Sequence, residues 1–167
     1  MVLGVNFYTG YICHHSFPMT FKQKVYQHFL AQLQNKIDAL QHKMDDLAES
    51  LKNETKSTAG DKHETARAFV HIEQAQTGAQ LNELLEQKGI LTALDIDIAT
   101  DKAIKGSLVK TDKAHFFISI AQGKAVIDGH VVFALSHLAP LGQKLMGATE
   151  EQIVEMNGTR YKILKIA

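Results

Sequence analysis

Residues 53–67 read NETKSTAGDKHETAR, a polar stretch with a glycine near its middle that separates two long helical patterns. Within it, Asp61 and Glu64 lie three residues apart. If a helix begins at Asp61, this spacing places the two carboxylates on one helix face, about one turn apart. A helical rod ending in this turn would be able to carry both carboxylates into the active site of another molecule.

The same two residues also fit a purely structural role. An acid followed three residues later by Glu is the pattern of a capping box, in which each side chain bonds the backbone amide of the other residue. Both acids also favour the positive end of the helix dipole. The structural and chemical interpretations are compatible, because a carboxylate at a helix start can be ordered and exposed at once.

The segment before the turn, from Phe21 to about Asn53, predicts one long helix with a narrow apolar stripe. Thr20 and Gln23 have the spacing of a capping box that opens it. The helix would be roughly 50 Å long, and its stripe can cover only one partner helix. The residues of this stripe are separated by alternating steps of four and three: Tyr26, Leu30, Leu33, Ile37, Leu40, Met44, Leu47 and Leu51.

The segment after the turn, from Glu64 to about Leu91, is predicted to be that partner. The connection is short and polar, so we expect an antiparallel pair with the Gly60 turn at its solvent-exposed tip. Ala68, Ile72, Ala75 and Ala79 are predicted to form one stripe, whose small residues near the turn allow close approach to the first helix. The larger Leu81, Leu84, Leu85 and Leu91 follow toward the far end, where they are expected to leave apolar surface for docking on something else.

Beyond residue 105 the apolar pattern changes from the helical period to the alternation typical of strands. Asp128-Gly129 and Asn157-Gly158 are tight-turn pairs that predict two hairpins. Pro140 to Met146 predicts a short helix that stops at Gly147. The fold class is therefore α+β: an antiparallel two-helix coiled coil followed by an antiparallel sheet with one short helix. The expected strands are 108–109, 116–120, 124–127, 131–135, 153–156 and 161–166.

The predicted organisation has four parts: a loose extension over 1–18, a coiled-coil hairpin over 19–92 with its tip at 53–64, a linker over 93–105, and a compact domain over 106–167. The extension contains no Lys or Arg, which argues against a signal peptide. Its Cys13-His14-His15 run lacks further partners and is not expected to bind a metal. Translation could start at Met1 or at Met19.

The composition excludes several classes of protein. The 167 residues include 18 Lys and Arg and 18 Asp and Glu, for a formal net charge of zero. This balance argues against a general binder of DNA or anionic membranes. The single cysteine cannot form an intrachain disulfide, and no apolar run reaches the roughly 18 residues of a membrane span. We expect a cytoplasmic monomer.

Three parts of the sequence resemble the bacterial Gre transcript-cleavage factors. The tip GDKHETARA is similar to the family's GDLKENAEY and matches it at Gly60, Asp61, Glu64 and Ala66. Glu73-Gln74 follow in the family's register, and residues 136–166 resemble its C-terminal segment. The resemblance covers roughly residues 20–167 and implies a coiled coil followed by an FKBP-like domain.

This resemblance implies a mechanism. The C-terminal domain would dock at the rim of the secondary channel of RNA polymerase, and the hairpin would enter the channel. Asp61 and Glu64 would help hold a second Mg²⁺ at the polymerase active centre, where the nascent RNA 3′ end of a backtracked complex is cut. The Mg²⁺ would be shared with the polymerase, and RNA and DNA would be met only within the elongation complex. The chain would be a co-catalyst and not an enzyme by itself.

The sequence departs from the family at three tip positions. Thr65 replaces Asn, Arg67 replaces Glu and Ala68 replaces Tyr. Arg67 puts a cation one helical turn from the acids, where it would repel a metal ion. The alternatives are therefore a secondary-channel regulator that does not stimulate cleavage, or a structural coiled-coil adaptor.

Prolyl isomerase activity is a further hypothesis for an FKBP-like domain, and we do not expect it. Its sites are concave and lined by aromatic side chains. The domain's Phe116, Phe117 and Phe133 are explained more simply as core residues.

Overall fold

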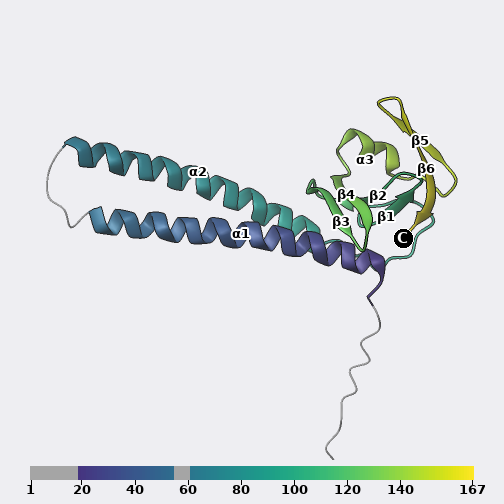
Figure 1. Ribbon diagram of the computed structural model, residues 1–167, viewed down its shortest axis with the longest axis horizontal. Coiled ribbons are helices and arrows are strands. Elements are labelled where there is room, and N and C mark those ends of the chain that lie inside the picture. Colours follow the sequence, from purple (N-terminus) through teal and green to yellow (C-terminus); the bar gives the residue numbers. More distant parts are fainter. Residues whose placement is uncertain (1–18, 55–60) are drawn as a thin grey trace, which may run out of the picture.

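The computed structural model describes residues 19–54 and 61–167, without the side chains of residues 53–54, 61–64 and 66. Two long helices, α1 (Phe21–Glu54) and α2 (Asp61–Thr92), lie side by side and project from a compact part that holds six strands and a short helix (Figure 1). The predicted helix pair is confirmed. The extension over 1–18 and the centre of the tip at 55–60 lie outside the described residues.

Both helices begin where the sequence indicates. At the start of α1, the amide of Thr20 donates to Gln23 Oε1 at 3.0 Å, and the amide of Gln23 donates to Thr20 Oγ1 at 3.2 Å. The predicted capping box is therefore present, and it satisfies two amides that the helix leaves unpaired. Helix α2 begins at Asp61, which is the start for which the spacing of the two tip acids places both on one helix face.

The compact part forms one sheet with the strand order β3-β4-β2-β1-β6-β5. The predicted α+β class is confirmed. The short helix α3 (Pro140–Leu145) follows β4. The strands are β1 (Leu108–Thr111), β2 (His115–Ser119), β3 (Gly123–Ile127), β4 (His130–Ser136), β5 (Ile153–Met156) and β6 (Thr159–Ile166).

One strand pair differs from the predicted antiparallel sheet. β2 and β4 run parallel, with Phe117 opposite Ala134, so the sheet is mixed. The burial of the strands explains this order. β3 exposes Lys124 and Val126 and takes the edge, whereas β4 buries Val132 and lies inside, against β2. The hairpin therefore places its second strand next to β2.

The two predicted hairpins are confirmed in their pairing and in their turns. β3 pairs antiparallel with β4, and β5 pairs antiparallel with β6. Asp128 and Gly129 have φ angles of 49° and 79°, and Asn157 and Gly158 have φ angles of 50° and 73°. Two successive positive φ values match the twist of the flanking strands, and Asn, Asp and Gly tolerate them best.

Helix α3 is held close to the end of β4. It begins with Pro140, and Gly147 follows it with a φ of 78°, as predicted for its stop. A Cβ atom at Gly142 would lie 2.1 Å from the carbonyl oxygen of Ser136. Only a glycine therefore allows this approach of α3 to β4.

Both faces of the sheet are buried, and one of them is covered by the root of the hairpin. Phe29 and Leu33 of α1 and Leu91 of α2 share a core with Phe117 and Val132. The rings of Phe29 and Phe117 stack with their centroids 6.4 Å apart. The opposite face holds a second core, which includes Phe116, Ile118 and Ile163 together with Leu145 of α3.

Polar contacts join the same two parts around the shared core. Lys24 Nζ lies 2.6 Å from Asp128 Oδ2 at the β3–β4 turn. The side chain of Gln122 accepts a hydrogen bond from Lys36 Nζ and donates one to Gln87 Oε1, so it bridges α1 and α2. The connection 93–107 holds no named strand and makes one isolated bridge, between Lys102 and Thr149. The hairpin is thus anchored in the sheet through its root.

We predict that Phe29→Ala destabilises the protein by about 3–5 kcal/mol, because its fully buried ring fills the shared core. Phe69→Ala is the matched control, since its ring is 68% exposed on α2 and its loss should change stability by less than about 0.5 kcal/mol. Chemical denaturation measured by circular dichroism gives both values. Equal effects of the two substitutions would contradict the shared core.

Candidate functional site at the hairpin tip

The tip acids lie at the end of the hairpin that is farthest from the sheet (Figure 1). Asp61 and Glu64 belong to the first turn of α2, directly after the turn from α1. Their spacing in a helix places them on one face. Their side chains lie outside the described residues, so their capping and metal-binding roles stay predictions.

Most of the outer part of the hairpin consists of the two helices alone. Ile37 is the last residue of α1 that is nearly fully buried, at 1% exposure. From there to Glu54 the helix continues for roughly 25 Å. The tip is therefore displaced from the sheet by a narrow two-helix rod.

The apolar stripe of α1 is placed as predicted. Leu33 and Ile37 are buried, and the other predicted stripe residues are half-buried along the contact with α2. Val25 and Phe29, which lie one position before two of the stripe residues, are buried against the sheet. The first half of α1 therefore faces two partners, the second helix and the sheet.

The predicted stripe of α2 is wrong in its first half. Ile72 is 54% exposed, and Ala68, Ala75 and Ala79 are exposed as well. Polar residues occupy several of the α2 positions that face α1. The spacing of the apolar residues therefore does not reveal which face of α2 is buried. Of the second half, Leu81 and Leu84 are half-buried and Leu91 is buried, whereas Leu85 is 42% exposed. The residues of α2 that are buried or half-buried along the true stripe are Val70, Gln74, Thr77, Leu81, Leu84, Lys88 and Leu91.

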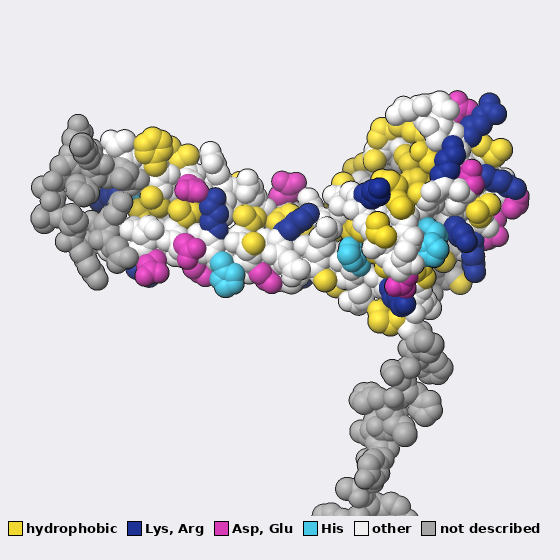
Figure 2. Space-filling model, in the orientation of Figure 1, with side chains coloured by type: hydrophobic (Ala, Val, Ile, Leu, Met, Phe, Trp, Pro, Cys, Tyr) yellow, Lys and Arg dark blue, Asp and Glu magenta, His cyan; other side chains and the backbone are white. Residues whose placement is uncertain are grey.

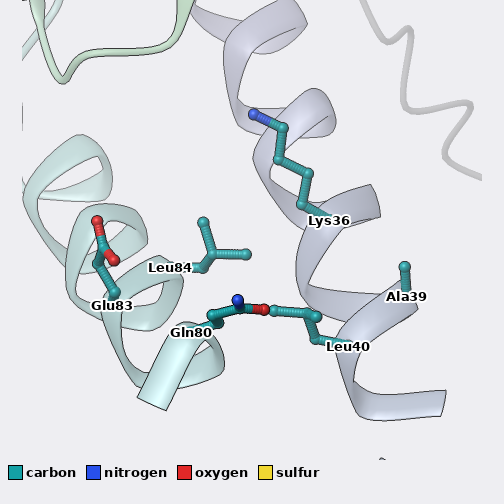
Figure 3. A pocket seen from close by; sticks show the side chains of 6 residues that line it. All are labelled: Lys36, Ala39, Leu40, Gln80, Glu83 and Leu84. Atoms are coloured by element: carbon teal, nitrogen blue, oxygen red, sulfur yellow. The ribbon is translucent and has the colours of Figure 1, made fainter. Parts of the chain in front are cut away.

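The contact between the helices is partly polar and loosely filled. Lys88 Nζ donates to Gln34 Oε1 at 2.6 Å, and Lys43 pairs with Glu73 at 2.8 Å. A groove of about 410 Å³ lies between α1 and α2, where the side chains of Leu40 and Gln80 point toward each other (Figure 3). The contact between the two helices is therefore less apolar than the core that the hairpin shares with the sheet.

The start of α2 has an unusual outward surface. Thr65, Arg67 and Ala68, the three positions that depart from the Gre motif, are all exposed. Phe69 is 68% exposed close by. The Arg67 side chain thus faces solvent within two turns of Asp61, where its charge can act on anything that approaches the tip.

A second concave surface lies on the compact part. A hollow of about 620 Å³ is lined by aromatic rings, including Phe116, Phe133 and Tyr161. Phe116 contacts Phe133 and Tyr161 at centroid distances of 5.8 and 5.4 Å. Figure 2 shows hydrophobic side chains gathered on this part of the molecule.

The sequence predicts a core role for the aromatic residues of this domain. Phe116 and Phe117 are buried as expected, whereas Phe133 is half-buried and contributes to the hollow. The hollow could not be predicted from the sequence, because its lining comes from segments far apart in the chain.

The described residues offer neither a metal-binding cluster nor a membrane-spanning helix. Among the side chains that the structure describes, which do not include those of residues 53–54, 61–64 and 66, no group of three or more His, Cys, Asp or Glu is placed to hold a metal ion. None of the helices within 19–54 and 61–167 is long and apolar enough to cross a membrane.

Comparisons with known proteins give little further information. Neither a protein-family model nor a curated protein matches the chain. A solved structure described as that of the transcription factor Gfh1 is similar at 14% sequence identity over 82% of this chain and 92% of that chain, with a TM-score of 0.32.

We predict that Thr77→Val stabilises the protein by about 1 kcal/mol. Thr77 is 2% exposed in the α2 stripe, and its hydroxyl makes no hydrogen bond with the described residues, so the substitution removes a buried polar group. Thr92→Val is the control, because the exposed Thr92 hydroxyl donates to the Lys88 carbonyl at 2.9 Å and gains nothing from removal. A loss of stability in Thr77→Val, measured by urea denaturation, would contradict the polar stripe.

Proposed function

We propose that this protein binds RNA polymerase and inserts its hairpin into the secondary channel, where Asp61 and Glu64 stimulate cleavage of backtracked nascent RNA. The observation that carries the proposal is a long two-helix rod, anchored at one end in a sheet, whose far end coincides with the helix start at Asp61. The resemblance of the tip sequence to the Gre motif supports the same assignment.

The dimensions of the hairpin suit this task. Each helix is about 10–12 Å wide with its side chains, so the pair is narrow enough for a channel that excludes a globular domain. The shared core around Phe29 fixes the direction of the rod relative to the sheet. A docked C-terminal domain would therefore aim the tip at a defined depth.

The chemistry needs few groups from this chain. Two carboxylates one turn apart can supply two oxygen ligands, and Mg²⁺ keeps several waters and takes its other ligands from its surroundings. We therefore propose that Asp61 and Glu64 complete a site whose other ligands come from the polymerase.

In that site the metal ion and the two carboxylates would have different roles. The metal ion would supply charge stabilisation and a polarised water. The carboxylates would fix its position and accept a hydrogen bond from the attacking water. Without the polymerase, the chain is expected to bind Mg²⁺ only weakly and to cleave nothing.

We predict that Asp61→Asn and Glu64→Gln each lower the rate of transcript cleavage at least about tenfold, because each removes one anionic metal ligand while keeping its shape. The assay uses the cognate polymerase stalled in a backtracked complex with Mg²⁺, and the shortened RNA is resolved on a gel. Glu49→Gln, an exposed acid on the outer part of α1, is the control and should leave the rate unchanged. Cleavage that persists in both tip variants would refute the proposed site.

A secondary-channel regulator without cleavage activity is the second candidate, and the exposed Arg67 favours it. Its positive charge opposes a metal ion at the neighbouring acids. In this case the protein would alter elongation or compete with a cleavage factor without shortening the RNA.

We predict that Arg67→Glu raises the cleavage rate, because it removes the opposing cation and introduces the residue type of the Gre motif. His71→Glu adds a carboxylate one turn farther from the tip on the same helix and should have little effect. The same gel assay compares the two variants. If the original chain is inactive and Arg67→Glu remains inactive while still binding the polymerase, the cation is not what prevents cleavage.

A further inference from the structure

A small hollow lies where the start of α1 meets the sheet, at the opposite end of the molecule from the hairpin tip. Its volume is about 340 Å³. Three lysines from three different elements reach it, Lys22 of α1, Lys110 of β1 and Lys165 of β6. His115 and the apolar side chains of Phe21 and Leu108 complete most of the wall.

The environment of Lys22 is unusual for a lysine. It is only 8% exposed, and within the described residues its ammonium group makes no hydrogen bond or ion pair. Burial lowers the pKa of Lys22, and Asp97 and Asp95 act in the opposite direction without reaching ion-pair distance. The stem of Lys22 is covered, and its unpaired ammonium group can take an anionic partner that enters the hollow.

Its neighbour on the same helix shows the contrast. Lys24 is exposed and pairs with Asp128 at 2.6 Å. Among the described residues that line the hollow, none has an acidic side chain, and the carbonyl oxygen of Ala167 accepts a hydrogen bond from the Leu108 amide at 2.8 Å. The three lysines of the hollow therefore exceed its internal negative charge.

The start of α1 adds backbone donors to the same place. The capping box uses the amides of Thr20 and Gln23. The amide groups of Phe21 and Lys22 have no partner among the described residues and belong to the positive end of a 34-residue helix. Free amides and lysines at a helix start are the donor set that binds phosphate groups.

We propose that this hollow binds the phosphate group of a small molecule, with Lys22 and the first amides of α1 as donors and with Lys110 and Lys165 balancing its charge. The volume lies at the lower end of the range for small-molecule sites, so a free phosphate or a mononucleotide fits better than a polymer. Phe21 offers an apolar surface to any ring attached to the phosphate. This site is independent of the tip and of the proposed role in transcription.

The test is a titration of the full-length protein with inorganic phosphate, followed through backbone amide NMR shifts. We expect saturable shifts at Phe21, Lys22 and Leu108. Lys22→Met keeps the buried stem of the side chain and removes its charge, so it should weaken binding by about 10–100-fold. Lys105→Met is the control, because Lys105 is exposed, lies outside the hollow and carries the same charge.

A thermal scan gives a second readout that a merely structural role of Lys22 would not produce. In phosphate-free buffer, Lys22→Met should not lower the melting temperature, because the covered stem of the side chain is kept and no partner of the ammonium group is lost. Added phosphate should raise the melting temperature of the original chain and not that of the variant. Tighter binding of adenosine monophosphate than of phosphate identifies a nucleotide site, and equal binding identifies a site for the free anion.

Three results would overturn the proposal. One is the absence of saturable shifts at these amides up to tens of millimolar phosphate. Another is an unchanged affinity in Lys22→Met. The third is binding of acetate as tight as that of phosphate, which would mark a general anion effect in place of phosphate recognition.

Discussion

The packing of Phe29 against Phe117 is the contact on which the arrangement of the molecule depends. It lies at the centre of a core that contains residues of α1, α2 and the sheet, so the hairpin and the C-terminal part are joined by buried apolar surface as well as by the chain. Hydrophobic burial is non-directional, but close packing of rings fixes an orientation. The direction of the hairpin follows from this contact.

The helices of the hairpin are packed against more of the structure at the root than toward the tip. At the root, α1 is covered by both the sheet and α2, and polar groups such as Gln122 add bridges between the elements. Beyond Ile37 the two helices have only each other, and Gln74 and Thr77 occupy positions that leucine fills in a tight coiled coil. The root of the hairpin therefore fixes the direction of the rod relative to the sheet.

Much of the fold is encoded in local patterns, and the exceptions have identifiable causes. The Thr20–Gln23 cap and the Asp128-Gly129 and Asn157-Gly158 turns are local signals, and all three are present. The parallel pairing of β2 with β4 depends on which strand of a hairpin is more buried, a comparison that no short window contains. The true stripe of α2 was hidden because its alanines face solvent while polar residues face α1.

The candidate tip could be located from the sequence because its acids lie in one short motif. The hollow beside Lys22 could not, since its lysines come from α1, β1 and β6 and are brought together only by the sheet order. Lys22 by itself looks like any lysine near a helix start. Its burial, which makes it informative, is a property of the assembled structure.

The shared core also has a consequence for how the chain is made. Phe117 is synthesised about 90 residues after its partner Phe29, and translation adds about 5–20 residues per second. The apolar face of α1 therefore waits roughly 5–20 s for Phe117 to be synthesised, and longer for the last strand of the sheet. During that interval α2 can shield only one side of α1, so the nascent hairpin presents Val25 and Phe29 to chaperones until synthesis of the sheet is complete.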